Sequence, residues 1–420
     1  MNDSCFFPAD ILLPDFDKVN GTKWSVIACD QYTSEPEYWA EVEKTVGNAP
    51  STLRLTLPEV FLSETEERVP QINAEMERYL KEILICHEHS MIYVERTQQN
   101  GKKGRGIVGM VDLEAYDFSK GANSLIRATE GTVVSRIPPR MKVRSGAMLE
   151  LPHVLLLIDD PEKTVIEPLG EIADGFAKAY DFDLMQKGGH VRGMFIPEAE
   201  EKRITKALSV LVLPEQMKKR YGEDCAPLLF AVGDGNHSLA TAKSCYEELK
   251  KSIGEEEAKK SPARYALAEI ENLHDDTLVF EPIYRVVFGA DGEELLCELK
   301  KYASAQKGSE APQTVTAVRA DGEEVITFAR PTSPLTVGTL QAFLDRYVET
   351  HDGVSVDYIH GEESLRRLAA GRGNIGFLFG GMKKDELFRT VIKDGALPRK
   401  TFSMGHADDK RFYLEARRIK

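Results

Sequence analysis

The sequence predicts a mixed α+β fold, because segments with helical periodicity are interspersed with short aliphatic runs typical of strands. Residues 64–86 show the clearest helical pattern, with apolar side chains recurring every three or four positions. Residues 228–251 read as a strand, a tight turn and an amphipathic helix. We expect a larger N-terminal unit at 1–289 and a smaller αβ unit at 290–420, because Gly-Ala-Asp-Gly at 289–292 punctuates the pattern.

The individual elements follow from the same two periodicities. Residues 36–46 and 64–86 predict helices, and residues 91–97 and 107–113 predict a hairpin with a polar, Gly-containing connection. The remaining expected elements are a strand at 154–158, helices at 161–178 and 198–212, a hairpin formed by 265–273 and 277–280, helices at 335–349 and 362–370, and strands at 354–359 and 375–379. Residues 265–273 also fit a short helix.

Composition excludes several classes of protein. Hydrophobic residues make up 42% and charged residues 29%, which is typical of a globular chain rather than a disordered one. The net charge of −14 argues against a broad surface for a nucleic acid polymer, although it permits a local anion pocket. The six Cys are scattered without a Cys-x-x-Cys pair, so we assign no disulfide framework and no metal site. The absence of a leader-like start and of long apolar runs predicts a cytoplasmic protein without membrane contact. The oligomeric state stays open.

The strongest chemical motif is Gly-Asp-Gly-Asn-His-Ser at 233–238, between the strand and the helix. Backbone N–H groups and the positive end of the dipole meet at a helix N-terminus, so Gly235, Asn236 and Ser238 are candidates to bind a phosphate. Asp234 is a candidate to orient a metal or a hydroxyl, and His237 to stabilise charge or move a proton. The alternative is a plain strand-to-helix turn capped by Asn236, since the motif is neither a P-loop nor a full Gly-x-Gly-x-x-Gly pattern.

A second group lies at Thr-Glu-Gly-Thr, residues 129–132, and the basic residues that follow it. Glu130 is a candidate general base and Thr132 a candidate phosphate ligand. The basic residues are Arg136, Arg140, Lys142 and Arg144. Arginine grips anions bidentately, so Arg140 is a candidate to hold a phosphate. The alternative is a solvated basic face, and only convergence with the loop at 233–238 would favour a shared pocket.

These residues resemble the bacterial and archaeal domain of unknown function 1015 family over nearly the whole chain. Asp-Gly-Asn-His at 234–237 is similar to the family's Asp-Gly-His-His-Arg-Tyr hallmark, and Glu130 and Thr132 match its His-Glu-x-Thr segment. The other matches are Arg140, Pro282, Arg285, Gly-Phe-Leu at 376–378, Pro398, Lys400 and Thr401. Ligand sites often lie at the junction of two units, so Arg285 or Lys400 is a candidate to complete the pocket. The family name implies no activity.

The chain departs from the family pattern at several hallmark positions. Ser238 stands where the hallmark has Arg, Asn236 replaces its first His, and Thr129 replaces the His before Glu130. These differences indicate a divergent branch with altered or lost activity. The turn before the helix is also similar to the loop of the ParB, sulfiredoxin and free-serine-kinase superfamily, which implies binding of nucleotide phosphates.

Three functions are consistent with these motifs. The first is an ATP- or ADP-dependent phosphotransferase for a small metabolite, with Glu130 as base, His237 and Asp234 in support, and Mg²⁺ on the nucleotide. The second is a non-catalytic sensor that binds a nucleotide or another anion. The third is a hydrolase that uses Glu130 and His237, and it ranks last because no activated nucleophile is visible.

Overall fold

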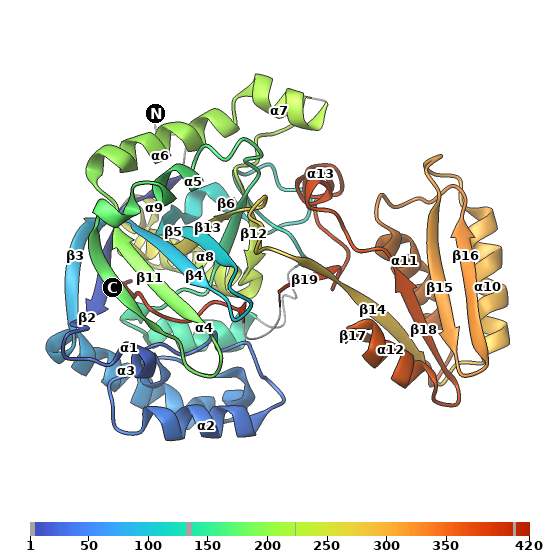
Figure 1. The fold of residues 1–420 in the computed structure, drawn as a ribbon, viewed down its shortest axis with the longest axis horizontal. Helices are drawn as coiled ribbons and strands as arrows, with labels where there is room; N and C mark the ends of the chain where they lie inside the picture. Colours follow the sequence, from blue (N-terminus) through green and yellow to red (C-terminus); the bar gives the residue numbers. More distant parts are fainter. Residues whose placement is uncertain (1–4, 132–136, 223, 406–408) are drawn as a thin grey trace. The chain divides into compact units, whose positions relative to one another are not determined.

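The computed structural model describes residues 5–131, 137–222, 224–405 and 409–420, which divide into two units (Figure 1). The first unit comprises Met1–Leu278 and His406–Lys420, and the second comprises Val279–Gly405. The expected division at 289/290 falls at the end of a strand that belongs to the sheet of the second unit. The last residues, expected in the C-terminal unit, return to the first one, where Tyr413 donates its backbone N–H to Val26. The fold is mixed α+β, as expected.

Ten strands of the described residues form the main sheet of the first unit, in the order β10-β11-β4-β5-β13-β9-β12-β7-β6, with β1 on β5. Their bounds are β1 Phe6–Phe7, β4 Ile92–Thr97, β5 Lys103–Asp112, β6 Tyr116–Asp117, β7 Ile126–Ala128, β9 Leu155–Ile158, β10 Ala177–Asp183, β11 His190–Phe195, β12 Phe230–Asp234 and β13 Tyr265–Asn272. Both faces of this sheet are covered. Along β5, Ile107 and Val111 enter one hydrophobic cluster, and Val108 enters another.

The helices of the first unit lie around the main sheet and the small sheets beside it (Figure 1). They are α1 Gly21–Trp24, α2 Pro36–Val46, α3 Thr65–Glu82, α4 Ile137–Gly146, α5 Glu167–Gly170, α6 Glu198–Leu211, α7 Pro214–Tyr221, α8 Asn236–Ile253 and α9 Glu255–Ala258. Two short sheets pair β2 Ala9–Pro14 with β3 Leu84–Ser90, and β20 Arg417–Arg418 with β8 Leu149–Glu150. Among the described residues, no helix is long and apolar enough to span a membrane.

Three expected elements of this unit differ from the structure. The helix expected at 64–86 ends at Glu82, because the following residues pair with β2 as β3. The helix expected at 161–178 is replaced by short helical turns and by β10, whose register with β11 is fixed by long-range pairing. Residues 265–273 do form a strand, but not a hairpin with 277–280, because the next strand joins the sheet of the second unit.

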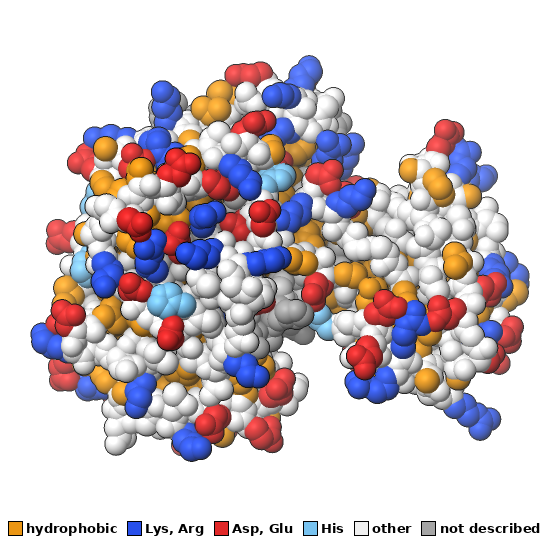
Figure 2. Space-filling model, in the orientation of Figure 1, with side chains coloured by type: hydrophobic (Ala, Val, Ile, Leu, Met, Phe, Trp, Pro, Cys, Tyr) orange, Lys and Arg blue, Asp and Glu red, His pale blue; other side chains and the backbone are white. Residues whose placement is uncertain are grey.

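The second unit is a six-stranded antiparallel sheet with helices, as counted over its described residues. The strands are β14 Phe280–Phe288, β15 Gln313–Arg319, β16 Gly322–Phe328, β17 Ser355–His360, β18 Asn374–Phe379 and β19 Phe402–Met404. The helices are α10 Gly292–Ala305, α11 Thr336–Thr350, α12 Glu362–Ala369 and α13 Lys384–Asp394. The alternation of helix and strand expected for this part of the chain is confirmed. Figure 2 shows that acidic and basic side chains are interspersed on the visible face of each unit.

Candidate functional site

The two sequence motifs meet because β7 and β12 are parallel neighbours. Phe230 pairs with Ile126 and Val232 with Ala128, so both strands end at the same edge of the sheet. The segment that begins at Thr129 follows one strand, and the loop that contains Gly235 follows the other. The carboxyl ends of parallel strands are a common position for ligand sites in α/β sheets. The backbone segments that carry the two motifs therefore lie next to each other, as a shared pocket would require.

Hydrogen bonds lock the two motifs together. The side-chain amide of Asn236 donates to Thr129 Oγ1 at 3.2 Å, and its Oδ1 accepts the Thr129 backbone N–H at 3.2 Å. The Thr129 hydroxyl in turn donates to the carbonyl oxygen of Val232 at 2.6 Å. Asn236 was expected to cap the helix or bind phosphate. Its side chain instead holds the segment of Glu130 against the loop.

Helix α8 begins with a glycine rather than with a side-chain cap. Gly235 is the N-cap at φ +76°, a left-handed conformation that favours glycine, and as a glycine it has no side chain that could cap the helix. A β-carbon at this position would lie 3.0 Å from the Val154 Cα, so the close approach also requires glycine. The first turn of α8 therefore presents backbone N–H groups and the positive end of the helix dipole behind an N-cap residue that has no side chain.

Asp234 is held on both carboxylate oxygens. One oxygen accepts the backbone N–H of Gly235 at 2.9 Å, and the other forms an ion pair of 3.0 Å with Lys410. The Lys410 side chain is only 15% exposed, so its charge is held close to the loop. The sequence did not single out Lys410, because it lies far along the chain from the loop that it contacts. His237, the second residue of α8, is half-buried.

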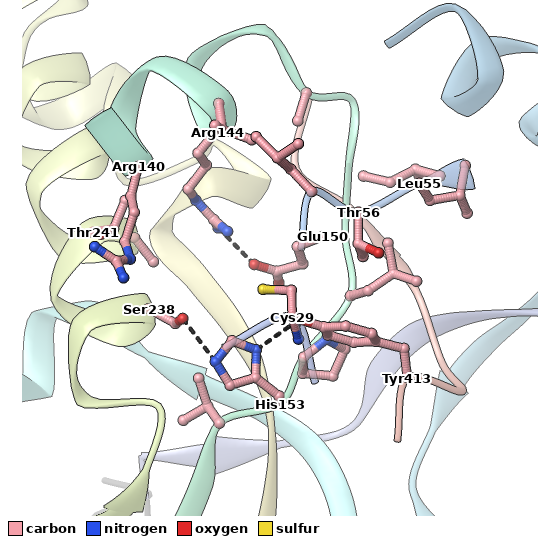
Figure 3. Close-up of a pocket in the computed structure, with 18 of the residues that line it drawn as sticks. Cys29, Leu55, Thr56, Arg140, Arg144, Glu150, His153, Ser238, Thr241 and Tyr413 are labelled. Atoms are coloured by element: carbon pink, nitrogen blue, oxygen red, sulfur yellow. Dashed lines mark hydrogen bonds and ion pairs between the residues drawn. The ribbon is translucent and has the colours of Figure 1, made fainter. Parts of the chain in front are cut away.

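A cavity of about 180 Å³ adjoins the first turn of α8 (Figure 3). Ser238 lines it, as does Val154, which also packs against Gly235. Its other polar or charged lining residues include Glu59, Arg140, Arg144, Glu150 and His153, and its apolar walls include Leu55, Leu57, Leu62, Met76, Val143, Leu149, Leu151 and Leu267. Of the expected site residues, Arg140 and Ser238 share this cavity, whereas Glu130 and His237 are not among the described residues that line it.

His153 links Ser238 to Tyr413 across the cavity wall (Figure 3). Its Nε2 lies 3.0 Å from the Ser238 hydroxyl, and its Nδ1 lies 3.0 Å from the Tyr413 hydroxyl. The Asp30 carboxylate lies 3.6 Å from Nε2. Burial by itself would raise the pKa of Asp30, but the nearby His153 and a hydrogen bond from Gln31 bring it below its ordinary value. The sequence analysis did not single out His153, because no motif surrounds this histidine in the chain.

Cys29 also lines the cavity, but as a thiol. Burial, and then the charge of Asp30, raise the pKa of Cys29 to about 12. A thiolate is the reactive form of cysteine, so Cys29 is not an activated nucleophile at neutral pH. This agrees with the sequence, in which none of the six Cys has the surroundings of a nucleophile.

Each described cation of the basic segment is paired with a carboxylate. Arg140 pairs with Glu59 and Lys142 pairs with Glu66. Arg144 donates to Glu150 at 2.5 Å. Figure 3 shows Arg140 and Arg144 descending from α4 toward α8 and Glu150. Thr132 and Arg136, which the sequence also singled out, lie outside the described residues.

Glu150 is the most heavily bonded of these carboxylates. It accepts from the Arg144 guanidinium, from Arg417 Nε at 2.8 Å and from the Leu267 backbone N–H at 2.8 Å. Burial alone would raise the pKa of Glu150, yet Arg417 and then Arg144 hold it below its ordinary value. The side chain is therefore a buried anion with two cations, which fixes α4 and the C-terminal strand at the cavity.

Arg285 and Lys400 lie in the second unit. Arg285 is fully buried and donates to Gln341 Oε1 at 2.7 Å and to the carbonyl oxygens of Arg399 and Lys400 at 2.8 and 3.0 Å. Its guanidinium thus ties together the backbone near the end of this unit. That these two residues complete the ligand site stays a prediction.

Comparison with protein families identifies the chain. The model of the family described as "Protein of unknown function (DUF1015)" matches residues 14–347, so the chain belongs to this family. A search of curated proteins finds no match. The resemblance drawn from the motifs is thereby confirmed.

Several solved structures are similar to this chain at low sequence identity. A conserved hypothetical protein from Pyrococcus furiosus is 12% identical, with a TM-score of 0.34, over 74% of this chain and 94% of that one. Free serine kinase in complex with AMP is 13% identical, with a TM-score of 0.36, over 73% and 90%. SbnI from Staphylococcus aureus, truncated at its C-terminus, is 11% identical, with a TM-score of 0.33, over 71% and 82%. TM-scores at this level carry no argument about function.

Proposed function

We propose that this member of the DUF1015 family binds the phosphates of a nucleotide at the ends of β7 and β12 and transfers a phosphoryl group to a small metabolite. One observation carries the proposal. The parallel strands bring Glu130 and the glycine-preceded N-terminus of α8 to the same edge of the sheet, joined by the hydrogen bonds between Asn236 and Thr129. Phosphoryl transfer depends mainly on positioning and on charge stabilisation, which this edge supplies.

The proposed roles follow from the local geometry. The backbone N–H groups at the start of α8 hold phosphate oxygens, and Gly235 allows their close approach. Glu130 accepts the proton of the attacking hydroxyl, and His237 stabilises the developing charge. A bound phosphate attracts Lys410 and competes with Asp234 for it. Asp234 is then the carboxylate available to Mg²⁺, which in such enzymes neutralises the charge of the nucleotide phosphates.

The cavity beside α8 is the proposed site for the apolar part of the acceptor, and the attacking hydroxyl extends from it toward Glu130, which is not among the described residues that line the cavity. Its volume of about 180 Å³ is below the roughly 300–1,000 Å³ of pockets that hold drug-sized ligands, so it suits a small metabolite rather than a nucleotide. Ser238 and His153 offer hydrogen bonds on one wall, and leucine side chains cover much of the rest. These walls favour an acceptor that combines a hydroxyl group with a short apolar part.

Turnover of nucleotide with a panel of hydroxylated metabolites tests this function. The full chain is incubated with ATP or ADP, Mg²⁺ and each metabolite, and phosphorylated products are detected by mass spectrometry. We expect one class of metabolite to be phosphorylated and Glu130→Gln to lower kcat by about 10²–10⁴-fold, the usual contribution of a general base. Glu88→Gln, an exposed glutamate on β3, is the matched control and should leave kcat unchanged. Equal activity of Glu130→Gln and the control would refute the role of Glu130.

A non-catalytic sensor is the second candidate, and specific contacts favour it. Lys410 and Thr129 already occupy the side chains of Asp234 and Asn236, which a catalyst would need for its ligands. Calorimetry separates the two functions. Nucleotide binding without turnover supports the sensor, and the absence of binding by any nucleotide or by phosphate removes both.

A further inference from the structure

Three metal-ligating side chains of the second unit face one another away from the site described above. Glu294 and Glu298 are four residues apart on α10, so they lie on one face of that helix. His351 follows the last residue of α11, a helix in contact with α10. One ligand atom from each of the three residues lies within 4.8 Å of the others. Carboxylate oxygens and an imidazole nitrogen are thus directed at one small volume.

The ring of His351 is oriented as in metal-binding histidines. Its Nδ1 lies 2.9 Å from the carbonyl oxygen of Tyr347 and 3.0 Å from the Thr350 hydroxyl, and because a carbonyl only accepts, the first contact favours the tautomer with the proton on Nδ1. In the neutral ring Nε2 then bears the lone pair that a metal ion requires. Stacking on Tyr347, with ring centroids 3.9 Å apart and an interplanar angle of 12°, fixes the plane of the imidazole.

The two carboxylates of the cluster lack an ion-pair partner among the described residues. In the described part of the chain, neither Glu294 nor Glu298 has an ion pair, whereas the adjacent Glu293 pairs with Arg319. Like charges four residues apart on a helix disfavour one another. A cation between them removes that repulsion.

Tyr347 gives an independent indication of a ligand. Its side chain is only 2% exposed, and its buried hydroxyl has no hydrogen-bond partner. Its ring stacks on the ring of His351, so Tyr347 lies directly beside this member of the cluster. A buried hydroxyl that no protein group satisfies is available to bond a ligand or a water.

We infer that Glu294, Glu298 and His351 bind one divalent transition-metal ion, with Zn²⁺ as the best match, and that the Tyr347 hydroxyl bonds a water or carboxylate in its coordination shell. Zinc takes carboxylate and imidazole ligands at about 2.0–2.2 Å, whereas Mg²⁺ and Ca²⁺ prefer oxygen ligands alone. Glu294 is exposed and is therefore able to move the short distance that closes the site. The inference does not depend on the proposed function.

Calorimetric titration of the full chain with ZnCl₂, after removal of metals with a chelator, tests the site. We expect the His351→Ala variant to bind one ion fewer per chain than the wild type, or to bind it at least about tenfold more weakly. Tyr347→Phe keeps the ring stack and removes only the hydroxyl, so we expect it to weaken binding by about 10–100-fold, as loss of an outer-shell partner does. His360→Ala is the matched control, because His360 lies in the same unit with Glu281 3.7 Å away.

Each variant differs from the wild type in a single side chain, so a change in Zn²⁺ affinity can be assigned to that side chain. A Zn²⁺ isotherm that is the same for His351→Ala, His360→Ala and the wild type overturns the inference. Circular dichroism of each variant checks that α10 and α11 are intact. If His351→Ala unfolds this unit, Glu294→Gln on the exposed surface provides the substitute test, with the same loss of affinity expected. An unchanged isotherm for that folded variant also overturns the inference.

Discussion

Replacement of Glu150 by Gln tests whether its ionic network holds the wall of the candidate cavity. The carboxylate is 7% exposed and pairs with Arg417, which is 5% exposed, and with Arg144, which is 18% exposed. Glu150→Gln keeps the size of the side chain and removes its charge. Two guanidinium groups then share a site without a carboxylate between them.

The expected cost follows from the burial of these three groups. Two unit charges about 4 Å apart attract by about 4 kcal/mol at an effective dielectric constant of about 20, and desolvation offsets much of this in the intact network. Removal of one partner leaves the desolvation of the other uncompensated, which costs about 3–5 kcal/mol in buried pairs. We expect the unfolding free energy of the first unit to fall by this amount in Glu150→Gln.

Tryptophan fluorescence during urea unfolding measures this loss. Both Trp residues, Trp24 and Trp39, are buried in the first unit, so their signal reports on this unit and not on the second. Glu66→Gln is the matched control, because Glu66 pairs with Lys142 at a site where it is 81% exposed. An exposed pair contributes at most about 1 kcal/mol. A loss in Glu150→Gln no larger than in this control would refute the reasoning.

The pH dependence of the same difference provides a second check. The pKa of Glu150 is held below its ordinary value of 4.5, so the folded state binds this proton less readily than the unfolded state does. The stability that the carboxylate contributes is therefore fully present above about pH 4.5, and it is lost as the pH falls through the folded-state pKa. The difference in unfolding free energy between the wild type and Glu150→Gln should be constant from pH 6 to pH 8, because both values lie well above 4.5. It should become smaller at acidic pH.

Three further perturbations follow from the structure. Thr129→Val removes the hydroxyl that bonds Asn236 and a backbone carbonyl of β12, so we expect it to cost about 1–2 kcal/mol by tryptophan fluorescence and to weaken nucleotide binding by calorimetry. Arg285→Met leaves several buried acceptors without a donor, and we expect hydrogen exchange of the second unit to show a loss of more than about 3 kcal/mol; normal protection would contradict this. Cys29 should resist alkylation at pH 8 in the folded chain and react after denaturation in urea, whereas the exposed Cys297 should react in both, as mass spectrometry would show.

Local patterns in the sequence predicted the elements whose partners are close in the chain. The hairpin of β4 and β5, the turn from β12 into α8, and the alternation in the second unit all follow from periodicity over short windows. The errors lie where a distant strand decides the conformation. Residues from Leu84 onward have apolar spacing that suits a helix, but pairing with β2 makes them a strand. Such pairing leaves no mark in a short window.

For the candidate site too, the residues that lie close together in the sequence were predicted, and those that lie far apart were not. The loop at 233–238 and the segment at 129–132 were visible as motifs, because their glycines and charged residues cluster in sequence. His153 was not visible, since its partners Ser238 and Tyr413 lie 85 and 260 positions away. Lys410 was not predicted as a site residue for the same reason, because it lies 176 positions from Asp234. Side chains that come together only after folding are far apart in the sequence, so they form no motif that can be recognised from local spacing.

The pairing of the basic segment changes how an acidic chain would hold an anion. Four basic residues in nine positions suggested a cationic pocket, but Arg140, Lys142 and Arg144 each face a carboxylate. Their charges are largely cancelled, so little net attraction remains for a ligand at that segment. At the start of α8 the nearby carboxylate is Asp234, which accepts the backbone N–H of Gly235 and pairs with Lys410. In the proposed site, an anion would therefore be held by backbone N–H groups at the start of α8 and by Lys410, the cation that lies beside this loop.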